Sequence, residues 1–122
     1  MNVLSRALSP EDVFRLHPKI RWTAYSVDGK VVFCQMRAGL QSYTSDAEDR
    51  AFMELGPLIM SGVAERLTPS EGAGKLESVI VNLGKDSVLL TRSGSGYLAV
   101  SVDRADASRV FQEIEPLLRK LH

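Results

Sequence analysis

Several residue types on which large protein classes depend are scarce in this 122-residue sequence. Its one cysteine, Cys34, rules out an internal disulfide, and its two histidines, His17 and His122, leave little material for a metal cluster. Lys and Arg number 15, as do Asp and Glu, so the chain lacks the excess of positive charge that nucleic acids and anionic membranes attract. We therefore expect no metal site and no nucleic-acid partner.

Long hydrophobic stretches are missing as well. No apolar run approaches the roughly 20 residues that cross a bilayer, and residues 1–8 lack the apolar stretch and cleavage site of a signal peptide. The sequence also contains no internal repeat, no low-complexity tract and no long linker. We expect residues 1–122 to form a single cytoplasmic domain without membrane insertion.

Helix and strand signals alternate along the chain. Ser9 and Pro10 are typical of a helix start, and Asp28-Gly29 is typical of a tight hairpin turn between two β-rich runs. The expected helices cover residues 10–16, the stretch from the caps at 44–46 to 67, and 107–121, and the expected strands cover 20–27, 31–36, 76–83, 88–92 and 97–102. This order, α-β-β-α-β-β-β-α, predicts an α/β (α+β) fold. Consecutive apolar residues at 79–81 and 88–90 favour a sheet covered by helices on both faces.

The middle helix carries two apolar stripes rather than one. The first consists of Ala51, Leu55, Leu58, Ile59, Gly62 and Val63, and the second of Met53, Pro57, Met60 and Ala64. At 100° per residue the two lie roughly 150° apart, so one stripe is expected to meet the sheet and the other a partner helix or a loop of the same chain. Pro57 is expected to kink or split the helix, because it removes an amide donor.

The expected strand at residues 76–83 is long, almost uncharged and free of proline. At the edge of a sheet such a strand is a template that proteins usually protect or pair, so pairing with a second copy would satisfy its backbone.

Catalytic chemistry is not visible in the sequence. Gly72-Ala73-Gly74-Lys75 looks like the end of a phosphate-binding loop, but Leu76 stands where a magnesium-binding hydroxyl belongs and a strand follows instead of a helix. Cys34 alternates with Val32 and Met36 on one strand face, as a small buried hydrophobe does. His17 precedes Pro18, which favours a structural role. We expect no catalytic residue and no cofactor.

The order of elements, together with Val27-Asp28-Gly29-Lys30 and the stretch from Gly74-Lys75-Leu76-Glu77 to Tyr97-Leu98-Ala99-Val100, resembles the roadblock family of dynein light chains and its archaeal and bacterial relatives. The resemblance covers about residues 10–121, and the same order occurs in profilin-like and longin-like domains. It implies a five-stranded antiparallel sheet with the middle helix on one face and the terminal helices on the other. It also implies homodimers or heterodimers in which the middle helices pack together and the third strands pair.

Carried onto this sequence, the implied dimer interface comprises Met53, Pro57, Met60 and Ala64 of the helix and Leu76, Ser78, Ile80 and Asn82 of the strand. Family members act as scaffolds or regulators of Ras-like small GTPases, mostly without chemistry of their own, which implies a small GTPase as partner here. The first alternative is a small-molecule sensor domain with an apolar pocket between helix and sheet. The second is an enzyme that uses Cys34, although no base or metal set accompanies that thiol.

Overall fold

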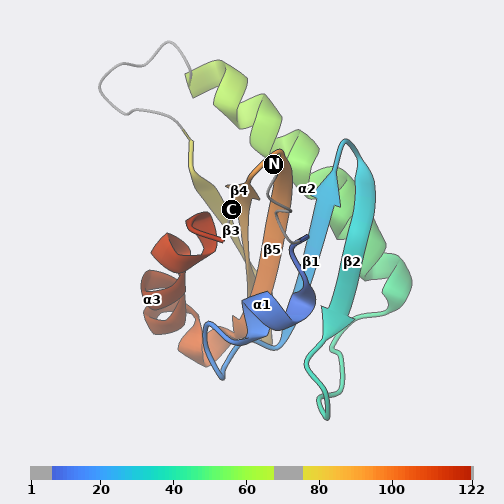
Figure 1. Ribbon diagram of the computed structural model, residues 1–122, viewed down its shortest axis with the longest axis vertical. Coiled ribbons are helices and arrows are strands. Elements are labelled where there is room, and N and C mark those ends of the chain that lie inside the picture. The colour runs from blue at the N-terminus through green and yellow to red at the C-terminus, as the bar shows by residue number, and fades with distance from the viewer. Residues whose placement is uncertain (1–6, 68–75, 122) are drawn as a thin grey trace, which may run out of the picture.

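The computed structural model describes residues 7–67 and 76–121 (Figure 1). Its elements are α1 (Pro10–Phe14), β1 (Trp22–Val27), β2 (Lys30–Met36), α2 (Asp46–Leu67), β3 (Ser78–Asn82), β4 (Asp86–Ser93), β5 (Gly96–Asp103), the 3₁₀ turn η1 (Arg104–Asp106) and α3 (Ala107–Arg119). The predicted order of helices and strands is therefore confirmed.

Local chemistry explains where two of these elements begin. Ser9 and Asp12 form a capping box at the start of α1, in which each side chain accepts a hydrogen bond from the other residue's backbone N–H. Asp28 and Gly29 have φ angles of 51° and 77°, the left-handed values that a two-residue hairpin turn between β1 and β2 requires.

All five strands join one antiparallel sheet in the order β2-β1-β5-β4-β3. The first hairpin thus lies beside β5, the last strand of the following meander, and β2 and β3 form the two edges. β3 is therefore an edge strand, the position considered for residues 76–83 in the sequence.

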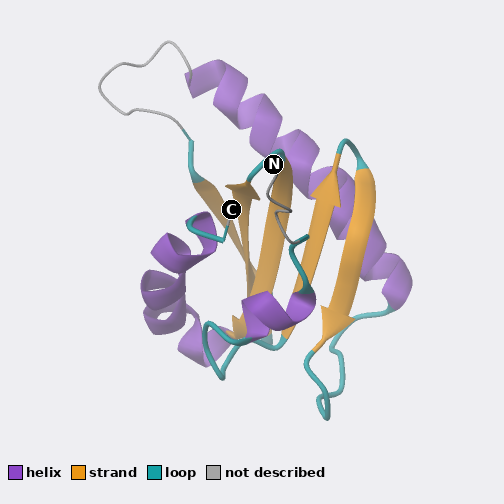
Figure 2. Cartoon of the chain, viewed as in Figure 1, coloured by secondary structure: helices purple, strands orange, loops and turns teal. Residues whose placement is uncertain are grey.

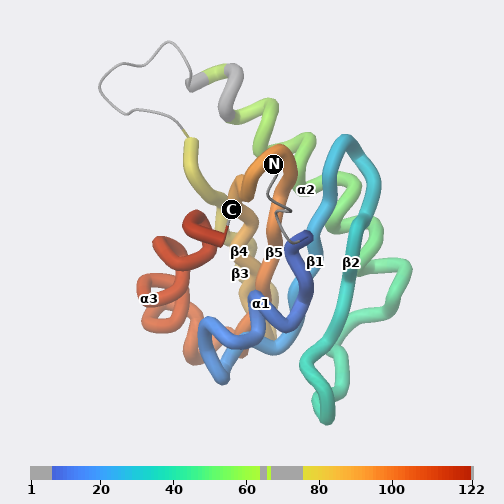
Figure 3. Tube along the Cα trace, in the orientation of Figure 1, coloured from blue at the N-terminus to red at the C-terminus, as the bar shows by residue number. Residues whose placement is uncertain are grey.

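Helices cover both faces of the sheet, as predicted (Figure 2). One core lies between the sheet and α1 and α3, and it contains Tyr25, Leu89, Leu98, Val110 and Ile114. The other lies between the sheet and α2, and it contains Trp22, Ala24, Met53, Met60 and Leu90. Figure 3 shows α2 crossing the sheet diagonally from the side of β2 toward β3. Trp22 and Tyr25 lie on opposite faces, as the strand alternation predicts.

Some local expectations are wrong. Cys34 is exposed rather than buried, because β2 is an edge strand whose residues are mostly exposed. Of the two outcomes expected for Pro57, a kink or a split, the split is wrong, because α2 runs through 22 residues with the proline in its interior. The Gly72-Ala73-Gly74-Lys75 loop lies outside the described residues.

Candidate functional site

An exposed aliphatic stripe runs along the outer side of α2. Its large members are Leu55, Leu58, Ile59 and Val63, with exposed fractions of 58%, 68%, 60% and 39%. Ala51 and Gly62 of the same stripe are exposed as well. An exposed group of large apolar side chains of this kind is typical of an interaction site. The stripe is therefore the first candidate functional surface.

The opposite side of α2 packs on the sheet. Met53 and Met60 are 2% and 0% exposed, so both belong to the core and neither can contact a partner. The interface predicted for these two methionines is wrong at residue level, because the sequence showed two apolar stripes but not which of them faced the sheet.

Two neighbours of the methionines carried the missed signal. Gly56 allows the helix to approach the sheet, since a Cβ placed there would lie 3.1 Å from Leu90 Cδ2. Ser61 forms a 3.0 Å hydrogen bond with the Tyr97 hydroxyl on the same side. Gly56, three residues after Met53 and four before Met60, lies on their side of the helix, and Ser61 directly follows Met60.

The other two helix residues of the predicted interface give less information. Pro57 is half-buried within the continuous helix. The side chain of Ala64 lies outside the described part of the structure.

The free edge of β3 lies next to the α2 side of the sheet. Val79 pairs with Leu90, which belongs to the core under α2, whereas Ile80 pairs with Leu89 of the opposite core. In antiparallel pairs the partners' side chains share a face, so Val79 points to the α2 side and Ile80, at 48% exposure, to the other. Pairing of this edge with another strand would use its backbone and leave both side-chain faces available.

The remaining strand residues of the predicted interface differ in their surroundings. Leu76 is half-buried and packs against the core under α2. Ser78 is half-buried, and Asn82 is exposed and accepts a 2.6 Å hydrogen bond from the Ser87 hydroxyl. Three of these four side chains are thus already partly buried or bonded within the chain.

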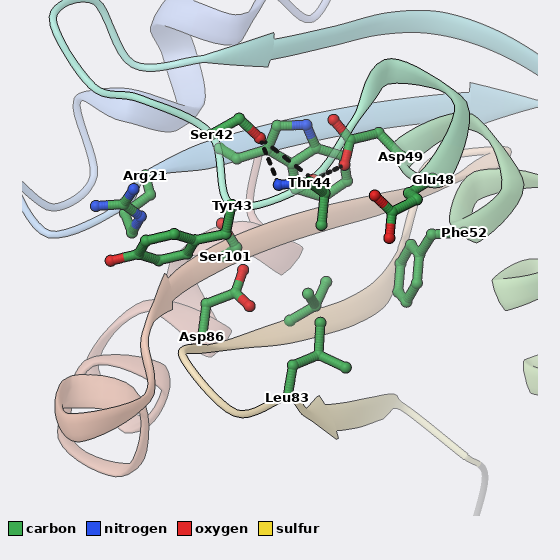
Figure 4. A pocket seen from close by; sticks show the side chains of 12 residues that line it. Arg21, Ser42, Tyr43, Thr44, Glu48, Asp49, Phe52, Leu83, Asp86 and Ser101 are labelled. Carbon is green, nitrogen blue, oxygen red and sulfur yellow. Dashed lines mark hydrogen bonds between the residues drawn. The ribbon is translucent and has the colours of Figure 1, made fainter.

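A pocket of about 180 Å³ opens where the loop before α2 meets the starts of β1 and β4 (Figure 4). It is lined by Arg21, Trp22, Ser42, Tyr43, Thr44, Glu48, Asp49, Phe52, Leu83, Asp86, Val88 and Ser101. Its lining combines aromatic and aliphatic side chains with three carboxylates and one guanidinium. No sequence motif marked this pocket, because its residues come from four segments far apart in the chain.

Hydrogen bonds hold the aromatic rim of the pocket. The Tyr43 hydroxyl donates to Asp103 Oδ1 at 3.0 Å, and this bond raises the pKa of the phenol. The Arg21 guanidinium stacks 4.2 Å from the centre of the Tyr43 ring and donates a 2.8 Å hydrogen bond to the Gln41 carbonyl. Arg21 also lies 3.7 Å from Asp103, so its charge is already shared with that carboxylate.

Two carboxylates of the pocket are poorly solvated. Burial raises the pKa of Asp49, although the Thr44 hydroxyl donates a hydrogen bond to it. Burial likewise raises the pKa of Asp86, which is 9% exposed; the charge of Arg21 opposes this shift, and the charges of Asp103 and Asp49 add to it. A buried carboxylate is costly to ionise unless positive charge or donors compensate it.

The residues considered for chemistry do not assemble into a reactive centre. Desolvation is the main reason that the pKa of the Cys34 thiol is raised, which disfavours the nucleophilic thiolate. His17 Nε2 lies 2.9 Å from Glu113 Oε2, and its Nδ1 accepts from the Lys19 backbone, so the ring connects the segment between α1 and β1 to α3. Within residues 7–67 and 76–121 no cluster of metal-ligating side chains occurs. In the same part of the chain, no helix has the length and apolar character needed to cross a membrane.

Comparison with known proteins places the fold. No family model and no curated protein matches the sequence. Among solved structures, the Roadblock/LC7 domain from Streptomyces avermitilis matches with a TM-score of 0.57 at 16% identity, over 88% of this chain and 92% of that chain. The gliding protein MglB from Thermus thermophilus matches with a TM-score of 0.62 at 9% identity, over 90% and 82% of the two chains. An MglB structure with a tetrameric arrangement gives 0.58 at 9% identity, over 90% and 82%. The chain therefore has the roadblock fold.

Proposed function

We propose that this protein is a non-catalytic dimeric module that scaffolds or regulates a Ras-like small GTPase. The observation that carries the proposal is the exposed stripe of Leu55, Leu58, Ile59 and Val63 on α2. Four large aliphatic side chains at helical spacing have no structural use in an isolated chain, and a second helix of the same kind would bury them.

The free edge of β3 supports self-association by the same face of the molecule. Figure 1 shows α2 passing behind the sheet toward β3, so a second copy placed there would meet both elements. Two β3 strands that paired would continue the five-stranded sheet across the dimer and satisfy the edge backbone groups. A two-fold interface of this kind is self-complementary, as most homodimer interfaces are.

Assembly in a structural neighbour is consistent with this proposal. One of the MglB structures that share the fold has a tetrameric arrangement. The roadblock resemblance of the sequence supplies the GTPase as the class of partner, which would bring the nucleotide and the chemistry.

Leu58→Glu tests the helix stripe. Leu58 is the most exposed of the four side chains, so the variant should fold as a monomer. In the proposed dimer interface, however, the glutamate would be a buried and unpaired charge. We expect a wild-type mass near twice 13.4 kDa by light scattering and a monomer for the variant at micromolar concentration. Leu117→Glu on α3, where the leucine is 40% exposed, is the matched control and should remain dimeric.

Two results would contradict the proposal. A Leu58→Glu protein that stays dimeric would remove the α2 stripe from the interface, and a wild-type monomer at every concentration would remove the dimer. The GTPase role is tested separately with purified Ras-like GTPases of the same organism, by measuring GTP hydrolysis and nucleotide release with and without the dimer. Unchanged rates together with no binding in either nucleotide state would refute it.

A further inference from the structure

The carboxylate of Asp86 has no obvious purpose in the isolated fold. The residue is 9% exposed and begins β4, directly opposite Asp103 of β5 in the strand register. Like charges that face each other across a strand pair repel, and Arg21, 3.7 Å from Asp103, offsets only part of this repulsion, because the pKa of Asp86 is still raised. A buried acid at this place is therefore a cost that another group should offset.

The other acids around the pocket already have donors within the chain. Asp103 accepts from the Tyr43 hydroxyl and faces Arg21, and Asp49 accepts from the Thr44 hydroxyl. Glu48 accepts a 3.0 Å hydrogen bond from the Ser45 backbone N–H, as part of the cap of α2.

Asp86 differs from all of these acids. Among residues 7–67 and 76–121, no side chain forms a hydrogen bond or an ion pair with its carboxylate, which is compensated only by the more distant charge of Arg21 and by its own backbone N–H. Figure 4 shows this carboxylate directed into the pocket.

The rest of the pocket favours a cation with an apolar body. Trp22 and Phe52 form an edge-to-face aromatic pair at 6.4 Å between ring centres, and both line the pocket with Val88 and Leu83. Aromatic faces attract cations, and an aliphatic wall accepts the flat body of a small molecule. Arg21, the pocket's own cation, is engaged by Asp103 and the Gln41 carbonyl.

We propose that this pocket binds a small organic cation, an ammonium, amidinium or guanidinium group on a compact apolar body, with the Asp86 carboxylate as its counter-ion. A volume of about 180 Å³ lies below the roughly 300–1,000 Å³ of pockets for drug-sized ligands, so it suits a group the size of a side chain and not a nucleotide. An amidinium can donate two parallel hydrogen bonds to one carboxylate, which is the geometry that unpaired carboxylate oxygens accept best. The site is independent of the proposed dimer and gives the domain a ligand of its own.

Benzamidine is the probe for this site, and benzamide is its neutral control of nearly equal shape. Trp22 is the only tryptophan of the chain and lines the pocket, so its fluorescence reports binding directly. We expect benzamidine to change this fluorescence saturably and benzamide to bind at least about tenfold more weakly. Equal responses to the two compounds, or no saturable response to benzamidine, would overturn the proposal without the use of any variant.

Asp86→Asn then identifies the counter-ion, because the amide keeps the shape of the carboxylate and removes its charge. We expect the affinity for benzamidine to fall about tenfold to a hundredfold, while light scattering gives an unchanged oligomer mass. Glu54→Gln is the control for lost negative charge, since Glu54 is exposed on α2 and does not line this pocket. Full affinity in Asp86→Asn would overturn the assignment of Asp86. A change of mass with Leu58→Glu, by contrast, bears on the dimer alone.

Discussion

At the scale of single residues, some polar side chains stabilise the fold and others do not. Arg37 donates hydrogen bonds of 2.7, 2.9 and 2.7 Å to the carbonyls of Ile20, Phe14 and His17, and so fixes the connection between α1 and β1. Each of these bonds satisfies a backbone carbonyl, and the His17 carbonyl also accepts from the Ile20 backbone N–H at 3.3 Å. Among the described residues, no side chain forms a hydrogen bond with the Asp86 carboxylate. The effect of its burial on the free energy of unfolding can be measured.

Asp86→Asn should change the pH dependence of stability in a defined direction. Burial raises the native pKa of Asp86, despite the nearby Arg21, so the folded state favours the protonated acid. The resulting stability is present below the unfolded pKa and is lost as the pH rises through the native pKa. The free energy of unfolding of Asp86→Asn minus that of the wild type should therefore increase as the pH rises from about 4 toward neutrality.

Urea unfolding followed by Trp22 fluorescence at several pH values measures this difference. Asp49, whose pKa is raised too, is present in both proteins, so the difference contains only its charge coupling to Asp86 and not its own burial. A difference that stays constant across this range, or that decreases, would show that Asp86 is fully compensated in the folded protein.

Gly96 is fixed by close approach of the backbone. A Cβ at this position would lie 2.3 Å from the Ser26 carbonyl oxygen and 2.9 Å from both Tyr25 Cε1 and Val27 Cγ2. Gly96→Ala should therefore force β1 and β5 apart and lower the free energy of unfolding by roughly 2–4 kcal/mol.

Gly84→Ala is the matched control, because a Cβ there meets nothing within 4 Å. We expect a change within about 0.5 kcal/mol for this variant by the same urea titration. Similar values for the two glycine variants would mean that the backbone of β1 adjusts easily around position 96.

At the scale of elements, α2 shows how far a pattern alone can lead. Helical periodicity indicated two apolar stripes without showing which one met the sheet, and the roadblock resemblance then placed the interface on the stripe of Met53 and Met60, which are buried. Hydrophobicity alone does not show which stripe packs on the sheet, since the exposed stripe is rich in Leu, Ile and Val. Close packing decides this, because Gly56 and the edge-to-face contact of Phe52 with Trp22 fit only the other side of the helix to the sheet.

Alanine substitutions test this assignment of the two sides. Met60→Ala should lower the free energy of unfolding by roughly 2–5 kcal/mol, because it leaves a cavity in the core. Leu58→Ala should change it by less than about 0.5 kcal/mol when unfolding is measured at submicromolar concentration, where association contributes least. A larger loss of unfolding free energy in Leu58→Ala than in Met60→Ala would show instead that the leucine side of α2 packs on the sheet.

The strands also show that side-chain direction can be predicted locally, whereas burial cannot. The alternation along β1 correctly placed Trp22 and Tyr25 on opposite faces, because side-chain direction in a strand is a local property. Cys34 was expected to be buried on similar grounds and is exposed. Its burial depends on how far α2 extends over the edge strand β2, and no local pattern contains that information.

At the scale of the whole molecule, the proposed dimer interface and the proposed ligand pocket lie at different places. The exposed α2 stripe and the β3 edge serve the proposed dimer, while the pocket beside Asp86 lies between the start of α2 and the sheet (Figure 4). A dimer that uses the first surface need not cover the second. Ligand binding and self-association can therefore be measured separately, as the two sets of variants require.

The sequence by itself determined the order of the elements, the hairpin at Asp28-Gly29, the helical covering of both sheet faces and the resemblance to the roadblock fold. These depend on capping, turn geometry and periodicity, which act over a few neighbouring residues. Only the tertiary structure decided which side of α2 is exposed and that Arg21, Tyr43, Asp49 and Asp86 meet in one pocket. Both results depend on packing between segments distant in the chain, where shape and partner count for more than hydrophobicity.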